Sequence, residues 1–295
     1  MRILVTGGSG FIGRNLVEML GERHQILAPT HTELELTDAD AVRAWLRANR
    51  PDAIVHGATK PGHRAARDVV GIAEANLRMF FALTSDRELC PRMVFLSSGA
   101  VYDSAHYLPR MAETYLGEHV PADASGWSKY VAARYIECAD NVVELRPFGV
   151  FGPYEDYSIR FISNALCRAL LGLPITLRQD RAFDYVWVAD LARVVEHFVE
   201  RPRSVLDHAA YNVTPDDTTS LLGAARMVLE VTGANVPIEV GAPGTGTEYS
   251  GDNARLRSEM SGLPFTPLRE AIRLLHEWYG SRIDQIDRAT VLADG

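Results

Sequence analysis

The first hundred residues alternate between two patterns of hydrophobic positions. Short continuous apolar runs at residues 3–5, 25–28, 53–55 and 93–96 predict buried strands of the kind found in parallel sheets. Between them, apolar residues recur every three or four positions, as at Ile12, Leu16 and Leu20 before Gly21, which predicts amphipathic helices. Strands that alternate with helices predict an α/β fold. In such a fold a doubly wound parallel sheet binds ligands at the carboxyl ends of its strands.

The alternation loosens after Pro153. The periodicity predicts helices at residues 158–171, 220–232 and 267–279, a short strand at 175–177, and loops at TPDDTTS and GAPGTGTEYSG. Asp38, or Thr37, is the expected N-cap of an early helix, and Asp190 that of a later one. The tail after Tyr279 fits an exposed helix, an arm that binds a partner, or a partly disordered segment.

A glycine-rich loop links the first predicted strand to the first predicted helix. It reads TGGSGFIG, so that Gly7 permits a tight turn, Gly10 lets the backbone approach a pyrophosphate, and Gly13 lets helix and strand pack closely. The helix N-terminus, which begins at Phe11 and Ile12, then offers free N–H groups to the phosphates. Glycines at this spacing, between a strand and an amphipathic helix, predict dinucleotide binding.

Composition narrows the classes of partner. The 295 residues are 47% hydrophobic and carry a net charge of −8, which favours a globular protein without nucleic-acid or anionic-lipid partners. The 3 cysteines are widely spaced and form no CxxC pattern, so we expect neither a disulfide framework nor a metal site. No apolar run approaches the length of a membrane span. These features predict an untargeted, cytoplasmic protein.

Five stretches carry a resemblance that covers nearly the whole chain. In order they are TGGSGFIG, FLSSGAVYD, SGWSKYVAARY, LRPFGVFGP and RAFDYVWVADLARVV. Together they resemble the extended short-chain dehydrogenases/reductases of the NAD-dependent epimerase/dehydratase family. The resemblance implies a Rossmann-like fold, a smaller C-terminal substrate lobe, bound NAD or NADP, a nucleotide-sugar substrate and a homodimer.

The resemblance also implies domain limits and site residues. Residues 1–152, completed by segments from about 184–215, would form the dinucleotide-binding domain, and residues 153–295 mainly the substrate lobe and tail. Substrate would meet Ser98, Gly149 and Arg181, although the family's usual asparagine is Gly149 here. The implied cofactor-binding residues are Gly7, Gly10, Phe11, Ile12, Gly13, Leu36, Ala58, Lys129 and Phe148.

Cofactor choice between NAD and NADP stays open. No Asp or Glu follows the second strand at Ala28-Pro29-Thr30 to hold a ribose 2′-hydroxyl, and no arginine stands there to hold a 2′-phosphate. His31 is an ambiguous substitute.

The family's catalytic set is incomplete in this chain. Ser98 and Lys129 match its serine and lysine, but position 125, where the family has a tyrosine, is Ser125. A phenol has a pKa of about 10, which a neighbouring ammonium lowers toward neutral pH. Serine is far less acidic, and its hydroxyl ends roughly 4 Å short of a phenolic oxygen. Ser125 therefore cannot simply replace tyrosine.

Three interpretations of Ser125 remain. The site has lost its chemistry, or another group supplies the proton, or the substrate itself supplies an acid or base. The replacement group would be Tyr102 beside the serine segment, a water relayed through Ser125, or one of the loop residues His106, Tyr107, Tyr115 and His119. Tyr130 points about 100° away from position 125 on a helix and is a poorer choice.

Two stretches of the sequence limit the activities that the resemblance allows. The dehydratases of this family carry Asp-Glu after the threonine of their catalytic segment, whereas this chain has Gly99 and Ala100, which disfavours dehydration. The stretch at residues 30–59 resembles the reductase and epimerase-reductase branch. We therefore expect an NAD(P)-dependent oxidoreductase or epimerase acting on a nucleotide-linked keto-sugar, with an atypical proton donor. The alternative is a protein that holds a dinucleotide without turnover.

The expected homodimer would form through two helices. The stretches at residues 65–83 and 128–139 match the helices that pair across a two-fold axis in the family. Their additional apolar surface would come from Phe80, Phe81, Tyr130 and Tyr135.

Overall fold

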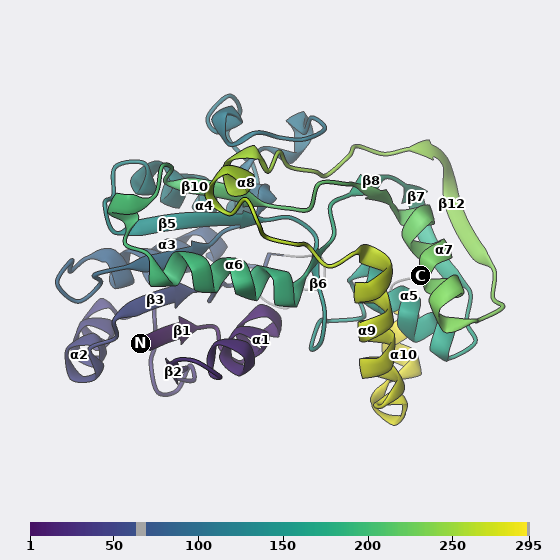
Figure 1. Ribbon diagram of the computed structural model, residues 1–295, viewed down its shortest axis with the longest axis horizontal. Helices are drawn as coiled ribbons and strands as arrows, with labels where there is room; N and C mark the ends of the chain where they lie inside the picture. Colours follow the sequence, from purple (N-terminus) through teal and green to yellow (C-terminus); the bar gives the residue numbers. More distant parts are fainter. Residues whose placement is uncertain (63–68, 294–295) are drawn as a thin grey trace.

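The computed structural model describes residues 1–62 and 69–293. Its centre is a six-stranded parallel sheet in the order β10-β5-β4-β3-β1-β2 (Figure 1). The strands are β1 (Arg2–Thr6), β2 (Gln25–Leu27), β3 (Ala53–His56), β4 (Met93–Leu96), β5 (Val142–Pro147) and β10 (Ala210–Val213). The predicted doubly wound α/β fold is confirmed.

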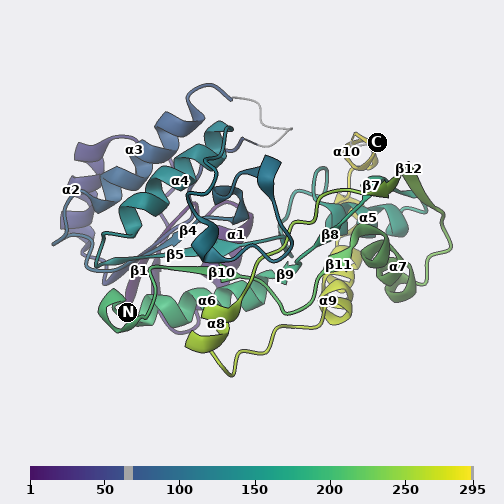
Figure 2. The ribbon, with the colours of Figure 1, turned by 90° about the horizontal axis from the view of Figure 1, so that it is seen from above.

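Helices cover both faces of this sheet. Figure 2 shows α2 (Ala39–Asn49), α3 (Ile72–Thr84) and α4 (Ala124–Ile136) on one side and α6 (Val188–Glu200) on the other. Helix α1 (Phe11–Leu20) packs beside α6. Alternate residues of β1 enter the two cores, with Ile3 facing α1 and α6 and Leu4 facing α2, α3 and α4. Burial on both faces explains why the strands read as continuous apolar runs.

A second hydrophobic core lies beyond the sheet. It joins α5 (Phe161–Leu170), α7 (Leu221–Thr232), α9 (Leu268–Gly280) and α10 (Arg288–Leu292) with the parallel pair β7 (Ile175–Asp180) and β12 (Ile238–Thr245). Figure 1 shows these elements grouped at one end of the molecule. Two further short strand pairs are present, namely β6 (Val150–Phe151) with β9 (Val186–Trp187), and β8 (Ala182–Phe183) with β11 (Thr219–Ser220).

Short helices connect these parts. They are η1 (Gly99–Val101), η2 (Ser104–His106), η3 (Glu113–Tyr115), η4 (Arg203–Val205), α8 (Ala254–Glu259) and η5 (Ile283–Gln285). Within the described residues, no helix combines the length and apolar character needed to cross a membrane.

The structure corrects three predictions about local elements. The helix predicted at 158–171 begins at Phe161, and residues 241–245, expected as the start of a loop, belong to β12, which pairs with β7. Asp190 is not an N-cap, because α6 begins two residues earlier. Its carboxylate instead accepts hydrogen bonds from Thr266 N (2.7 Å) and Thr266 Oγ1 (2.8 Å). The Asp190 carboxylate can bond outside its own helix because Thr266, from a distant part of the chain, presents both an N–H and an O–H donor to it.

The predicted N-cap Asp38 is confirmed, since its side chain accepts from the backbone of Asp40 and Ala41. The tail after Tyr279 ends as α10, which is held against α5. There the Val291 side chain is buried and its carbonyl oxygen accepts a hydrogen bond from Asn164 Nδ2 at 3.2 Å.

Candidate functional site

The glycine loop has the geometry that its spacing predicts. Gly7 has a φ of +74°, in the region that favours glycine, and a Cβ on it would lie 2.9 Å from Ala58 N. A Cβ on Gly13 would lie 2.0 Å from Gly7 O, so that position cannot carry a side chain. Gly10 is exposed and is the N-cap of α1, where the helix presents unpaired N–H groups. This cradle fits the pyrophosphate of a dinucleotide.

A cavity of about 450 Å³ opens beside this loop. Its lining brings together Gly7, Leu36 and Ala58, three of the expected cofactor-binding residues, and adds Glu35 and Met79. The cavity lies where the strand order reverses between β1 and β3, which is where doubly wound sheets bind their ligands.

The end of β1 is fixed to the end of β3 by one hydroxyl. Thr6 Oγ1 accepts hydrogen bonds from Gly57 N and Ala58 N, each 3.2 Å long, and lies 2.8 Å from His56 Nδ1. Burial lowers the pKa of His56 to about 4, so its imidazole is neutral at pH 7. This polar link sets the shape of the cavity floor.

Two positions of the family's catalytic set, one of them the altered position 125, are directly connected. Lys129 Nζ donates a hydrogen bond to Ser125 Oγ at 3.0 Å, one turn away on α4. Desolvation lowers the pKa of Lys129, while Asp123 and Glu144 act in the opposite direction. The serine hydroxyl therefore serves here as an acceptor for the ammonium.

Ser98 reaches the same region from the carboxyl end of β4. Helix α4 packs against η1, and the contact is close because a Cβ on Gly126 would lie 2.7 Å from Ala100 O. The Ser98 hydroxyl accepts a hydrogen bond from Ala100 N at 3.2 Å. Packing of η1 on α4 thus brings the Ser98 segment beside the Ser125 end of the helix.

Tyr102 belongs to a different, buried network. Its hydroxyl donates to Asn212 Oδ1 and accepts from Arg146 Nη1, both at 2.9 Å, and the side chain is 2% exposed. Arg146 also pairs with Glu144 at 2.7 Å. Burial raises the pKa of Tyr102 to about 12. Both hydrogen-bonding capacities of this phenol are occupied within the sheet, away from the Lys129–Ser125 pair.

The other loop residues divide into two groups. His106 is paired with Asp103 Oδ2 at 2.5 Å and stacks on His119, and Tyr115 Oη donates to His106 O at 3.4 Å. His106, His119 and Tyr115, with Asp103, form an outer cluster. Tyr107 points inward and donates from its hydroxyl to Gly99 O at 3.2 Å, one residue from Ser98.

The loss of the family's asparagine at Gly149 has a steric explanation. A Cβ on Gly149 would lie 2.5 Å from Asp184 O, because Val186 N donates to Gly149 O at 3.1 Å and draws the two strands together. No side chain fits there. Phe148 fills the neighbouring space and packs against Tyr249, with ring centroids 4.8 Å apart.

Tyr249 is a residue of this region that the sequence analysis missed. It comes from the glycine-rich loop after β12, and its hydroxyl lies 2.6 Å from the point where a Cβ on Gly99 would stand. A tyrosine between glycines in a predicted loop gave no periodic signal. Its position depends on a long-range pairing with the segment around Phe183.

Arg181 has a charge that no carboxylate neutralises within residues 1–62 and 69–293. Its guanidinium lies 4.2 Å from the centre of the Phe183 ring. Asp180 accepts from Leu222 N, and Asp184 accepts from Thr214 and Gly251 N, so neither aspartate pairs with it. A half-exposed cation stacked on an aromatic ring is suited to an anionic group.

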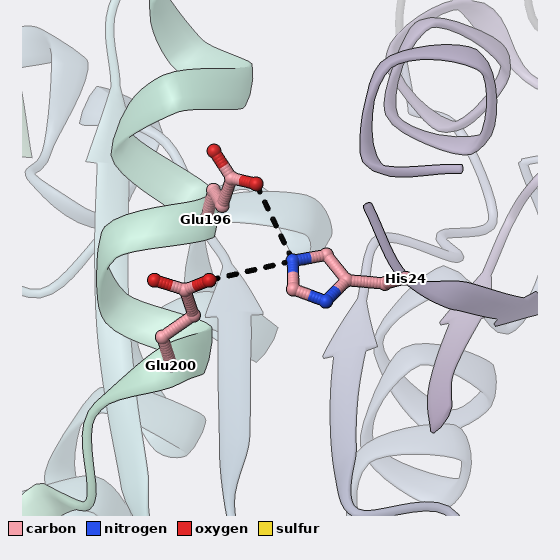
Figure 3. Close-up of side chains that lie close together, drawn as sticks. All are labelled: His24, Glu196 and Glu200. Carbon is pink, nitrogen blue, oxygen red and sulfur yellow. Dashed lines mark ion pairs between the residues drawn. The ribbon is translucent and has the colours of Figure 1, made fainter. Parts of the chain in front are cut away.

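One cluster resembles a metal site but is explained by ion pairing. His24 Nε2 lies 3.3 Å from Glu196 Oε1 and 3.5 Å from Glu200 Oε1 (Figure 3). Arg23 Nη1 also lies 2.9 Å from Glu196 Oε1, so a cation already occupies that oxygen. The cluster stands before β2 and at the end of α6, at the amino ends of the strands. It joins α6 to the turn after α1 on the side of the sheet remote from the glycine loop.

Comparisons with known proteins agree with this geometry. A family model described as "NAD dependent epimerase/dehydratase family" matches residues 3–214. The GDP-L-fucose synthase of Azorhizobium caulinodans is 33% identical over 106 residues, which are 34% of this chain and 34% of that protein. The dTDP-4-keto-6-deoxy-D-glucose reductase of Streptomyces niveus is 28% identical over 244 residues, covering 79% of this chain and 80% of the reductase.

A solved structure shows the same fold. The GDP-D-glycero-L-gluco-heptose synthase of Campylobacter jejuni, determined in the presence of NADPH, has a TM-score of 0.82. The match covers 95% of this chain and 98% of that one, at 18% sequence identity.

Proposed function

Because this chain belongs to the NAD-dependent epimerase/dehydratase family, we propose that it reduces the keto group of a nucleotide-linked sugar with NADH or NADPH. The family and its relatives make it an enzyme that uses NAD or NADP. The finer proposal, keto-sugar reduction, is supported by the similarity to the Streptomyces niveus reductase and by Gly99-Ala100, which replace the acid pair of the dehydratases.

The dinucleotide would lie along the cavity beside the glycine loop. Gly10 and the first N–H groups of α1 would bind the pyrophosphate, and Leu36 and Ala58 would line the adenosine end. Lys129, held by Ser125, would bind the nicotinamide ribose. When bound, the reduced nicotinamide supplies the hydride.

Arg181 is the residue on which the proposed substrate-binding site depends. An unpaired guanidinium on the Phe183 ring, in a segment that resembles the family's diphosphate-contacting RAFDY stretch, would bind the nucleotide diphosphate by paired hydrogen bonds. The diphosphate would anchor the sugar, and the sugar would then reach toward Ser98 at the end of β4.

The first experiment measures binding and turnover separately. Dinucleotide that copurifies with the protein is identified, and reduced dinucleotide is then offered with GDP-, dTDP-, UDP- and CDP-linked keto-sugars. We expect loss of the reduced-nicotinamide absorbance with one of these nucleotides. Bound dinucleotide without turnover on any of them would favour the alternative, a dinucleotide-holding protein, to which Ser125 points.

A matched pair of variants tests the diphosphate site. Arg181→Leu should weaken nucleoside-diphosphate binding roughly 10- to 150-fold, the value of a hydrogen bond to a charged group. The control is Arg178→Leu, because Arg178 is an exposed arginine of the preceding strand β7. Equal calorimetric affinities in the two variants would contradict the proposed role of Arg181.

A further inference from the structure

We propose that the Tyr249 hydroxyl donates the proton that Ser125 cannot supply. The inference rests on the proposed reduction, and its premise is a missing phenol at position 125 beside a retained Lys129. The structure offers a second phenol at the same end of β4. Tyr249 Oη lies 2.6 Å from the point where a Cβ on Gly99 would stand, so it touches the residue that follows Ser98.

The chain holds Tyr249 in this position through its backbone. Tyr249 N donates to Ala182 O at 2.9 Å, and Asp184 N donates to Tyr249 O at 3.2 Å. The carboxylate of Asp184 also accepts from Gly251 N at 2.8 Å. The loop that carries the phenol is therefore fixed to the same strand segment that carries Arg181, and the phenol and the proposed diphosphate site are positioned together.

Two glycines make room for the aromatic side chains. A Cβ on Gly99 would lie 2.6 Å from Phe148 Cε1, and a Cβ on Gly251 would lie 2.5 Å from Phe148 Cε2. Phe148 is thus held between the two glycines, and the Tyr249 ring packs against it. A side chain at Gly99 would displace the Tyr249 hydroxyl from its place beside Gly99.

Tyr249 differs from Tyr102 and Tyr107 in that no hydrogen bond engages its hydroxyl within the described residues. Tyr102 is bound to Asn212 and Arg146, and Tyr107 donates to Gly99 O. The Tyr249 side chain is partly exposed. A half-buried hydroxyl with an unused donor is suited to a substrate oxygen.

The surroundings favour an acid over a base. Desolvation raises the pKa of Tyr249 far above its usual value, and the surrounding groups are Tyr107, Arg160, Asp184 and Tyr102. The phenol therefore holds its proton at neutral pH, and the positive charge that the nicotinamide would gain on losing hydride would lower this pKa as the proton leaves.

The step balances without a further reactant. Hydride passes with its electron pair from the reduced nicotinamide to the carbonyl carbon, and the C=O π bond breaks toward oxygen. That oxygen takes the proton of Tyr249 Oη, giving a secondary alcohol, oxidised nicotinamide and a phenolate. Water then returns a proton to the phenolate.

The test compares Tyr249→Phe with Tyr107→Phe, since both phenols stand beside Gly99 in one aromatic cluster. Tyr249→Phe should lower kcat by about 100-fold or more, and Tyr107→Phe by less than about tenfold. A second readout needs no turnover. With oxidised dinucleotide present, Tyr249→Phe should weaken binding of the keto-sugar nucleotide about tenfold and leave binding of the nucleoside diphosphate unchanged.

A rescue variant separates loss of chemistry from loss of packing. Ser125→Tyr added to Tyr249→Phe returns a phenol beside Lys129, and it should recover part of the lost kcat. Parental kcat and parental keto-sugar affinity in Tyr249→Phe would overturn the inference and leave the proposed reduction standing. A parent protein that binds dinucleotide and turns over none of the keto-sugars would instead overturn the proposed function.

Discussion

Tyr102 shows how one residue can change role between sequence and structure. By position it is a candidate proton donor, but its hydroxyl bridges Asn212 and Arg146 inside the sheet. Tyr102→Phe leaves both partners short of one hydrogen bond in a buried site, so we expect a loss of about 1–3 kcal/mol in the free energy of unfolding. Urea denaturation measures it.

The same variant carries a kinetic expectation. The rate per folded molecule should be that of the parent, because the phenol is not in the proton path. A severe loss of kcat in a fully folded Tyr102→Phe protein would return the catalytic role to Tyr102 and remove it from Tyr249.

Glu155 is a second residue with a measurable consequence. It is buried, accepts a hydrogen bond from Ser163 Oγ at 2.5 Å, and desolvation raises its pKa from 4.5 to about 8. The unfolded chain ionises this carboxyl near its ordinary pKa, whereas the folded protein keeps the proton until about pH 8. The stability that protonated Glu155 contributes to the folded protein is therefore fully present below the pKa of this carboxyl in the unfolded chain. It is lost as the pH rises through the pKa of the carboxyl in the folded protein.

Glu155→Gln tests this linkage. The parent should lose up to about 1.4 kcal/mol of stability per pH unit across that window from this group, and the neutral isostere should lose none of it. Thermal unfolding of both proteins at pH 6 and pH 8 gives the comparison. Identical pH dependence in the two would show that Glu155 is ionised in the folded state.

At the scale of an element, the turn from β1 into α1 separates binding from folding. A Cβ on Gly10 meets only Gly7 O, at 3.3 Å, and the position is exposed. Gly10→Val should therefore leave the chain folded and abolish dinucleotide binding, because the side chain occupies the pyrophosphate space. Gly13→Val should instead disrupt the turn, since its Cβ would lie 2.0 Å from Gly7 O. Circular dichroism and cofactor titration distinguish the two variants. Undiminished dinucleotide affinity in Gly10→Val would contradict the assignment of this loop.

At the scale of the whole molecule, α3 and α4 predict a dimer. Phe81 on α3 is 38% exposed, Tyr135 on α4 is 39% exposed, and their rings meet edge to face. Phe80, which the sequence analysis placed on the same surface, is instead 1% exposed and belongs to the core. Of the helix expected at residues 65–83, residues 65–68 lie outside the described residues, and α3 begins at Ile72.

We expect a homodimer in which these two helices of each protomer form an isologous four-helix interface. Light scattering at micromolar concentration should give twice the mass of the chain, and Phe81→Asp should give the mass of one chain. A parent protein of monomeric mass would exclude this assembly.

The sequence by itself determined the fold class and half of the site. The apolar runs and the helical repeats fixed the order of strands and helices, because burial on one or both faces imposes a local period. The glycine loop could be assigned because each of its glycines is needed for a local backbone conformation or a close contact. Lys129 and Ser125 could be placed together because residues four apart lie one turn apart on a helix.

Tertiary structure decided which phenols lie beside Gly99, the residue after Ser98. Tyr102 is adjacent in sequence, yet its side chain turns into the sheet, where Arg146 and Asn212 hold it. Tyr249 is 151 residues from Ser98 in the printed numbering, and it arrives beside Gly99 because its backbone pairs with the segment around Phe183. Contacts across such separations follow from strand pairing and from the space that Gly99 and Gly251 leave open. Neither of these produces a repeating pattern in the sequence from which the contact could be predicted. Local periodicity therefore specified the sheet and the cofactor loop, and long-range packing specified the groups at the reacting end.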